Sequence, residues 1–386
     1  MSTELTGKEL MLYRTKLLRE AATFGKPDRI PYRSNVFTWL FLDSGYTVAE
    51  GSRDYDIMYK CVDNFLTKYK VDAISGNGLR NPFRLTDALG GSLAYTDSVS
   101  ENLNVGDEPI ISAEDYDAII KDWQAVIWEK ATFNKFPKAR SYTPQQMAAA
   151  AKEFVAFGQG RAKIVSMMEE HGAGHGAAST IWLFYESLFN FYRGIKALSI
   201  DLRRCPEKLE EVCSFMDEEL TRPVLEKLSA TDTFDPAFSA DICIPMLGHT
   251  ILNRKQFDKL MAPTIKRVCD TAAAHGKHVF FFSEGSFIRL GDFLNSFDKG
   301  TVSMMVEQDD PFEIRAKYPN IGIYGGLSVS VMGHGTPEEC VDMVKKCIDK
   351  LGRDGGYVLM ENKMVSFSYD MRSENLKAVA DYVAAQ

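Results

Sequence analysis

Short apolar runs recur along this chain, and amphipathic stretches with helical spacing separate them. Strands that alternate with helices in this way form parallel sheets, because each helix carries the chain back to the same edge. Eight such units predict a closed (β/α)8 barrel, a TIM barrel, more than an open sheet. The predicted strands are Arg29–Asn35, Val71–Gly78, Lys163–Glu170, Phe234–Ile244, His278–Gly285, Thr301–Asp310, Ile321–Ser328 and Gly356–Asn362.

The sequence also marks the starts of several helices. Thr336, followed by Pro337 and Glu339, predicts a capping box, and the Cys205-Pro206 step predicts the start of another helix. Two stretches do not fit the repeat: Arg84–Pro109 is interpreted as an irregular hairpin insertion and Trp123–Gly160 as helical. We expect an amino-terminal decoration, both insertions on one rim, and a single domain over residues 1–386.

The composition excludes several classes of protein. A hydrophobic content of 45% supports a large core, and a net charge of −8 disfavours a nucleic-acid-binding surface. No run of about twenty apolar residues is free of charge, so neither secretion nor membrane insertion is expected. The seven cysteines form no CxxC pair, which indicates buried thiols in a reducing compartment and no thiolate zinc site. We therefore expect a cytoplasmic protein.

Polar or ionisable residues end most of the predicted strands. The carboxyl ends of barrel strands meet at one mouth, where the catalytic groups of this architecture lie. A strand end is also polar wherever it simply reaches water. We expect Asn35, Asn77 and Glu307 to contact a substrate there and Asp241 to take part in catalysis. The full set is Asn35, Asn77, Glu169–His171, Asp241, Glu284, Glu307–Asp309, Ser328 and Glu361.

Glu284 and Glu361 are the strongest candidates for the chemistry. Each follows an unbroken hydrophobic run, VFFFS or YVLM, so we expect both carboxylates to lie close to the barrel interior. Apolar walls disfavour the charged form and raise the pKa of a carboxyl group toward the range of a general acid. If a divalent cation lies between them, both stay ionised and serve as metal ligands. A third interpretation pairs either carboxylate with an arginine such as Arg33 or Arg289.

Three histidines are further candidates for substrate contact. His171 and His175 lie in the segment EEHGAGHG, directly after a predicted strand, and are four residues apart. On a helix this spacing would place both on one face for a metal ion, but the interleaved glycines favour a loop whose histidines contact a substrate. His249, beside a glycine at a strand–helix junction, is either an acid/base group or an ordinary loop residue.

Other motifs narrow the reaction class. The aromatic run Trp182–Tyr192 is consistent with a binding site for an aromatic ring, although helix core is the commoner reason for such a run. No GxGxxG follows a predicted strand, and neither GxxxxGK(S/T) nor GxSxG occurs. Nicotinamide, nucleoside triphosphate and serine hydrolase chemistry therefore lose support.

Three segments resemble the uroporphyrinogen decarboxylase superfamily. Gly335–Val383, which contains GTPEECVDMVKKCIDKLGRDGGYVLMENK and ENLKAVADYV, is similar to the carboxyl-terminal block of that family, where a GTPEE helix leads to a GGY(I/V)L strand and an EN helix. KPDRIP at Lys26–Pro31 looks like the family's entry into its first strand. PEKLEEVCSFMDEE at Pro206–Glu219 resembles its middle helix. Together these segments reach over nearly the whole chain, so the resemblance implies the same barrel.

The chain departs from the better-known branches of this superfamily. The arginine-rich motif that grips porphyrinogen carboxylates is absent, because VFTWLFLDSG follows RIPYRSN. The thiol-using methyltransferases hold zinc with an HxCG motif and a cysteine on the last strand. Here the HxCG positions read Phe282-Ser283-Glu284-Gly285, and the last strand offers Glu361. Hard carboxylates replace soft thiolates, which disfavours tetrapyrrole decarboxylation and thiol activation alike.

What remains is similar to the methyltransferase component of the corrinoid-dependent O-demethylases of anaerobic metabolism. The resemblance implies methyl transfer from a phenyl methyl ether to cob(I)alamin on a separate corrinoid-binding protein, since this chain has no DxHxxG cobalamin-anchoring motif. It implies Glu284 as the first choice for the acid or the metal ligand, with Asp241, Glu307 and Glu361 behind it and zinc as the metal if one is bound. The barrel mouth would be the docking face.

Three further expectations stay open at this point. A homodimer fits the fold. A decarboxylase or another lyase of this fold is the alternative activity, and a non-catalytic binding protein on an inherited barrel is the third interpretation. The identity of the methyl donor depends on side chains that the sequence alone does not place.

Overall fold

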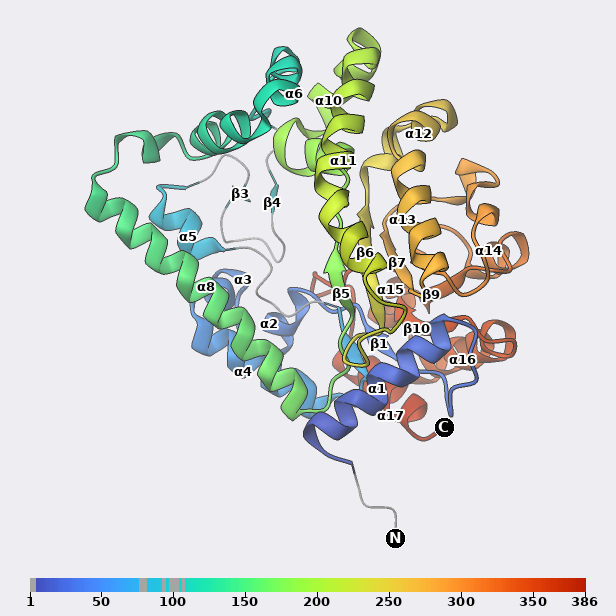
Figure 1. Ribbon diagram of the computed structural model, residues 1–386. Helices are drawn as coiled ribbons and strands as arrows, with labels where there is room; N and C mark the ends of the chain where they lie inside the picture. Colours follow the sequence, from blue (N-terminus) through green and yellow to red (C-terminus); the bar gives the residue numbers. More distant parts are fainter. Residues whose placement is uncertain (1–4, 76–81, 92–94, 97–103, 106–107) are drawn as a thin grey trace.

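Eight parallel strands form the centre of the fold (Figure 1). The computed structural model describes residues 5–75, 82–91, 95–96, 104–105 and 108–386. Six strands pair in the order β10-β9-β8-β7-β6-β5, and the other two pair as β1-β2. The strands are β1 (Arg33–Ser34), β2 (Ala73–Ile74), β5 (Ala177–Thr180), β6 (Ala240–Met246), β7 (Val279–Ser283), β8 (Val302–Met305), β9 (Gly322–Leu327) and β10 (Tyr357–Glu361).

Two parallel bridges join these sheets into a ring. Tyr32, just before β1, bridges Leu359 of β10, and Ala73 of β2 bridges Gly174, just before β5. At the first seam the Leu359 N–H donates to the carbonyl oxygen of Pro31 at 3.0 Å, and at the second the Gly174 N–H donates to a carbonyl oxygen at 2.7 Å. The barrel that the strand–helix alternation predicted is confirmed.

One predicted strand is wrong. Lys163–Glu170 forms the end of helix α8 (Pro144–Glu170), and the third barrel strand is β5 instead. The helix starts at a capping box made by Thr143 and Gln146, with Pro144 at its first position. The strand β5 has the sequence AAST, and it carries no large apolar side chain that could have marked it.

Helices connect the strands and cover the outside of the barrel (Figure 1). The Thr336 capping box is confirmed at the start of α16, and Pro206 is confirmed at the start of α11. The helices besides α8 are α1 (Gly7–Ala22), α2 (Trp39–Asp43), α3 (Val48–Arg53), α4 (Tyr55–Lys68), α5 (Phe83–Ala88), α6 (Tyr116–Gln124), α7 (Thr132–Lys135), α9 (Phe184–Ser187), α10 (Gly194–Arg204), α11 (Pro206–Ser229), α12 (Arg254–Leu260), α13 (Ala262–Ala274), α14 (Pro311–Lys317), α15 (Val329–His334), α16 (Pro337–Cys347) and α17 (Ser373–Ala384).

The two insertions lie to one side of the barrel. In Figure 1, α5 and α8 lie on the left and α6 lies at the top, and the short strands β3 (Tyr95–Thr96) and β4 (Asn104–Val105) lie between α8 and α11. The antiparallel pairing of β3 with β4 fits the predicted hairpin. Trp123–Gly160 is helical as predicted, apart from a short bend before α8. Within the described ranges, no helix is both long and apolar enough to cross a bilayer.

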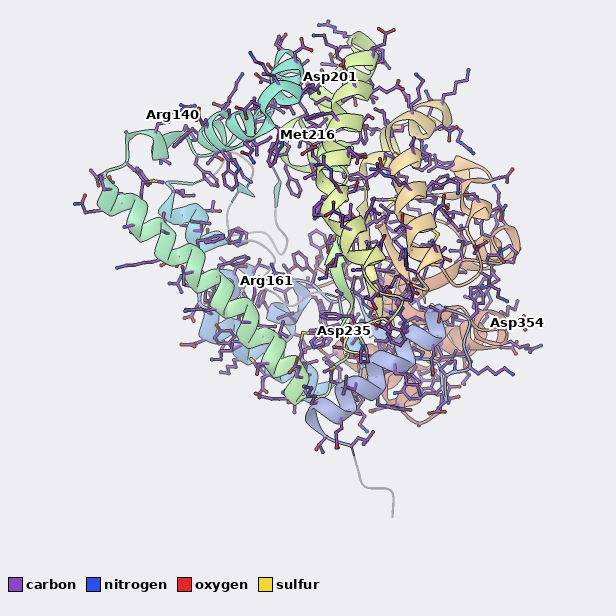
Figure 2. All side chains as sticks on the ribbon, in the orientation of Figure 1. Arg140, Arg161, Asp201, Met216, Asp235 and Asp354 are labelled. Atoms are coloured by element: carbon purple, nitrogen blue, oxygen red, sulfur yellow. The ribbon has the colours of Figure 1, made fainter. Side chains whose placement is uncertain are left out.

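Helix α1 closes the amino-terminal end of the barrel, which we call the floor. A Cβ atom at Gly322 of β9 would lie 2.3 Å from the carbonyl oxygen of Ala22, so only glycine lets the helix end pass this close. Asp235 and Asp354 precede β6 and β10, and both lie in the lower half of Figure 2, so the floor lies toward the bottom of that view. The carboxyl ends of the strands open on the opposite end, the mouth.

Candidate active site

The strand register identifies the inner face of the barrel. Successive strand residues point to opposite faces, and Phe280 and Tyr324 belong to an apolar cluster separate from the larger core that packs against the outer helices. Residues paired with members of this inner cluster face inward too. The inward-facing residues are Arg33, Ala73, Thr180, Asp241, Cys243, Phe280, Phe282, Met305, Tyr324, Val358 and Met360.

Solvent reaches part of this inner face. Thr180 is exposed and Cys243 and Phe282 are half-buried, whereas Ile242 and Ile244 on the outer face of β6 are buried. In a barrel filled throughout by side chains, inward residues would be as buried as outward ones. Since α1 covers the floor, this part of the interior is reached from the mouth.

Glu284 lies at the mouth, directly after β7. It continues the inward alternation of Phe280 and Phe282, its side chain is half-buried, and its N–H donates to the carbonyl oxygen of Met246 at 2.9 Å. Gly285 follows with φ +75°, and a Cβ atom there would lie 2.5 Å from Thr250 Cγ2. The tight turn therefore requires glycine, and it holds Glu284 at the carboxyl end of the strand, where the sequence placed it.

Two carboxylates from the next strand end fix this turn. Glu307 accepts a hydrogen bond from the Gly285 N–H. Asp309 accepts from Ser286 Oγ at 2.5 Å and from the Phe287 N–H at 2.6 Å. Glu307 is thus at the mouth, as expected, and its carboxylate holds the segment that carries Glu284. Its predicted contact with a substrate stays a prediction.

Glu186 of α9 is a carboxylate at the mouth that the sequence analysis did not single out. Its side chain is fully buried and accepts hydrogen bonds from the N–H groups of Leu247 and Gly248, at 2.9 and 2.8 Å, and from Asn190 Nδ2 at 3.1 Å. Burial and, to a smaller extent, the neighbouring charge of Glu284 raise the pKa of Glu186 to about 7, against the effect of these hydrogen bonds. A single acidic residue within the run FYESLFN was the available signal.

Glu361 does not face the barrel interior, contrary to the prediction. It directly follows the inward-facing Met360, so it points to the outer side of the wall. There it is fully buried and accepts hydrogen bonds from the Tyr32 hydroxyl, from Ser34 Oγ at 3.1 Å and from the Asn35 N–H at 2.6 Å. Burial raises the pKa of Glu361. Its carboxylate ties β10 to β1 at the seam of the barrel.

Asp241 lies at the floor and not at the mouth, because it is near the beginning of β6. Its carboxylate accepts a hydrogen bond from Arg19 Nη2 at 2.8 Å and one from the His278 N–H at 2.8 Å. The predicted strand Phe234–Ile244 placed Asp241 too close to the carboxyl end. The residue anchors α1 to the barrel, so its predicted catalytic position is wrong.

The two histidines of the glycine-rich segment also lie away from the mouth. They follow helix α8 and precede β5, whereas the prediction had them after a strand. His171 Nε2 lies 2.8 Å from Asp63 Oδ1, and His175 Nε2 lies 3.3 Å from Glu169 Oε1. Their expected position at the substrate end of the barrel is therefore wrong, and the reason is the misplaced strand.

His249 follows β6 at the mouth, as expected. Its ring is fully buried and lies 4.9 Å from the Phe287 ring between centroids, and among the described residues neither ring nitrogen makes a hydrogen bond of normal length. Burial and, to a smaller extent, the charge of Arg289 lower the pKa of His249 to about 3, against the effect of the Ser286 backbone, so the imidazole is neutral. The arginine donates to backbone carbonyls, including that of Leu252 at 2.6 Å, so the predicted pairing of Arg289 with a catalytic carboxylate does not occur.

Asn35 and Arg33 lie on the inner side of β1. Asn35 is fully buried; its Nδ2 lies 3.4 Å from Met305 Sδ, and its Oδ1 has no donor in the described part of the chain. Arg33 is buried too, with Nε donating to Ser75 Oγ at 3.1 Å. Asn77 lies outside the described residues, so its predicted contact stays a prediction.

The described side chains do not fit a zinc ion. Glu284 and Glu361 lie on opposite faces of the barrel wall, so they cannot share a cation as the prediction had them do. Over the described ranges, no group of three His, Cys, Asp or Glu residues has a spacing suited to a metal. Cys243 is the cysteine that faces the interior, and burial raises its pKa to about 11, which keeps the thiol protonated.

Eight parallel strands closed into a barrel, with acidic side chains at the carboxyl end, define the class of TIM-barrel enzymes. The family model described as uroporphyrinogen decarboxylase (URO-D) matches residues 195–386, from α10 to the end of the chain. The matched part of the chain, residues 195–386, belongs to the uroporphyrinogen decarboxylase superfamily. No curated protein matches the chain.

Proposed function

We propose that this enzyme is a methyltransferase that moves the methyl group of a methoxylated aromatic compound to cob(I)alamin on a separate corrinoid-binding protein. The observation that carries the proposal is the position of Glu284. Its carboxyl group lies at the open end of a barrel interior whose walls are aromatic and whose floor is closed. A methyl ether held there would present its methyl group to an acceptor that docks at the mouth.

The aromatic walls suit a flat substrate. Phe280 and Tyr324 lie 4.7 Å apart between ring centroids, and the half-buried Phe282 lies 6.4 Å from Phe280. Rings at such separations attract further rings by offset or edge-to-face contact. A substrate ring bound against them would be oriented without any charged group at the reacting oxygen.

The acidic pair at the mouth can supply the proton that the reaction needs. When bound, cob(I)alamin supplies the nucleophile for the methyl carbon. The carbon–oxygen bond breaks, its electron pair stays on the phenolate oxygen, and that oxygen takes up a proton that Glu186 holds and that passes through the Glu284 carboxylate. Glu186 can hold this proton near neutral pH, because burial, together with the charge of Glu284, raises its pKa to about 7.

The proposal is tested by methyl transfer in vitro. The purified enzyme is incubated with cob(I)alamin, free or on a corrinoid-binding protein, and with a panel of methoxyarenes. We expect loss of the Co(I) absorption and one phenol released for each methyl group moved. Transfer from other methyl donors but from none of the methoxyarenes would contradict the proposed substrate class.

A decarboxylase or another lyase of this superfamily is the second candidate, and one observation favours it. Arg33 places a cation inside the barrel, and a guanidinium is a natural partner for the carboxylate that such a reaction removes. Release of CO2 from an aromatic acid, with its methoxy group intact in the product, would select this alternative.

A further inference from the structure

Arg33 is a buried cation without a carboxylate partner. Its side chain faces the barrel interior, with Cζ 5.0 Å from the centroid of the Phe280 ring and 5.8 Å from that of Tyr324. Its Nε donates a hydrogen bond to Ser75 Oγ at 3.1 Å. Among the residues that the structure describes, no Asp or Glu lies within 4.0 Å of its guanidinium.

The other buried arginines show how this chain normally treats such a charge. Arg19 pairs with Asp241 at 2.8 Å and Arg193 with Asp201 at 2.7 Å, and the partly buried Arg29 pairs with Asp72 at 2.5 Å. A buried charge is costly unless it is paired and hydrogen-bonded. The guanidinium of Arg33 has five N–H donors, and its partners among the described side chains, Ser75 Oγ and the Tyr324 hydroxyl, are neutral, so its charge is available for an anion.

The surroundings of Arg33 leave room for such an anion. A Cβ atom at Gly176 would lie 3.0 Å from Arg33 Nη2, so a side chain there would crowd the guanidinium, and glycine avoids this. On the neighbouring β6, Cys243 is half-buried, and on β5 Thr180 is exposed. The guanidinium thus borders the part of the interior that solvent reaches.

Asn35 supplies a second polar group between Arg33 and the mouth. It directly follows β1 and faces inward, and its buried Oδ1 has no donor among the described residues. In the same part of the chain its amide nitrogen is bonded to Met305 Sδ at 3.4 Å, and sulfur is a weak acceptor. A buried amide in this state has hydrogen-bonding capacity for a polar substituent on a ligand.

We infer that Arg33 is a specificity-determining residue of this site, and that it binds a carboxylate on the substrate deep in the barrel. The aromatic ring of the substrate then lies against Phe280 and Tyr324, and the methoxy group at its far end points to Glu284 at the mouth. This inference rests on the proposed function for the methoxy group alone, because an aromatic carboxylate would bind Arg33 whichever reaction follows.

Binding measurements without a methyl acceptor test the inference directly. The probes are 4-methoxybenzoate and 4-methoxybenzamide, which have nearly the same shape and differ in charge, and binding is measured by calorimetry. We expect the benzoate to bind at least about 10-fold more tightly than the benzamide. Arg33→Gln should weaken benzoate binding by roughly 10- to 100-fold and change benzamide binding less than about 3-fold.

Two further variants separate charge recognition from loss of structure. Arg33→Lys keeps the charge without the planar fork and should retain part of the preference for the benzoate. Lys26→Gln removes an exposed positive charge at the floor and should leave both affinities unchanged. Thermal unfolding of each variant shows whether it is folded at the temperature of the measurement.

The outcomes keep this inference distinct from the proposed function. Equal affinity of the wild-type protein for both probes, binding of neither, or an equal loss of both in folded Arg33→Gln overturns the role of Arg33. Charge-dependent binding through Arg33 with no methyl transfer from any methoxyarene leaves the inference standing and removes the proposed function. Methyl transfer that prefers neutral methoxyarenes supports the proposed function and overturns the role of Arg33.

Discussion

The two ends of the barrel treat buried charge in opposite ways. At the floor, Asp72 accepts hydrogen bonds from Arg29 at 2.8 and 2.5 Å and from the Tyr32 N–H at 2.9 Å, and Asp241 is paired with Arg19. In the interior above the floor, Arg33 has no carboxylate partner among the described residues. The carboxylates at the floor are held by arginines, although Arg19 Nη1 makes no hydrogen bond to a described residue, whereas the guanidinium in the interior keeps capacity for an anionic ligand.

The carboxylates at the mouth divide in the same manner. Glu307 and Asp309 are engaged in fixing the turn after β7, and Glu186 binds two backbone N–H groups. Glu284 is carried by the turn that these interactions fix. Glu284, which we propose acts on the substrate, is thus positioned by carboxylates that do not. The two kinds of residue should respond differently to substitution.

The largest effect should come from Glu284. Glu284→Gln removes the acid but keeps the size of the side chain, so methyl transfer from a methoxyarene should fall by about 10²- to 10⁴-fold in kcat. The measurement is single-turnover methyl transfer to cob(I)alamin. Glu226→Gln, on the exposed side of α11, is the matched control and should be silent. Unchanged turnover in Glu284→Gln would remove this residue from the mechanism.

The floor should respond in stability and not in turnover. Asp72→Asn removes a buried carboxylate that the partly buried Arg29 and Arg14 share, which should lower the free energy of unfolding by about 3–5 kcal/mol. Asp349→Asn breaks an exposed pair with Arg353 and should change stability by less than about 1 kcal/mol. Urea unfolding checks both. If Asp72→Asn altered kcat in folded protein while stability was unchanged, the contrast between floor and mouth would fail.

The sequence could predict the barrel because side chains that face the core must be apolar. This requirement produces the strand and helix periodicities that are visible in the sequence. Val279–Ser283 and Tyr357–Glu361 are apolar because both faces of these strands are covered, and they were recognised for that reason. Ala177–Thr180 was missed because its inner face borders solvent and its residues are small. The weak signal of that strand and the open interior therefore have the same cause.

The candidate site could be predicted only in part. The pattern of apolar residues shows that a strand exists, but it does not fix the residue at which the strand starts or ends, or which face each side chain takes. Glu284 was placed correctly, because it lies at the carboxyl end of the strand under both the predicted bounds, His278–Gly285, and the observed bounds, Val279–Ser283. Successive residues of a strand face opposite sides, so Glu361 faces outward because Met360 faces inward. Asp241 lies at the floor because its strand starts later than predicted. Glu186 lies on a short helix after β5, and its approach to β6 depends on tertiary packing that no local pattern carries.

Glu186 offers a test of the mouth that depends on pH. Its pKa is raised from 4.5 to about 7 in the folded protein, so its contribution to stability is present below pH 4.5 and is lost as the pH rises through 7. Glu186→Gln cannot ionise, and relative to wild type it should gain about 2–3 kcal/mol between pH 5 and pH 8. Urea unfolding at both values checks this, and a constant difference would show that Glu186 is not buried in an acidic pair.

The smallest effect we predict separates two buried histidines. The pKa of His249 at the mouth is lowered from 6.5 to about 3, so the unfolded chain takes up the proton first and stability is lost as the pH falls below 6.5. His249→Gln removes this titration, so relative to wild type it should gain about 2 kcal/mol between pH 7 and pH 5. Urea unfolding at the two pH values provides the measurement.

His278 at the floor provides the comparison for that result. Burial lowers its pKa to about 4, yet its ring is bonded to the Gly300 carbonyl oxygen at 2.9 Å and to Ser303 Oγ at 2.8 Å. His278→Gln should therefore lose about 1–3 kcal/mol at pH 7, where His249→Gln loses less, because only the first variant gives up two hydrogen bonds. Equal losses at pH 7 would mean that the ring of His249 is as fully bonded as that of His278, and the mouth would then lack the spare polar capacity that distinguishes it from the floor.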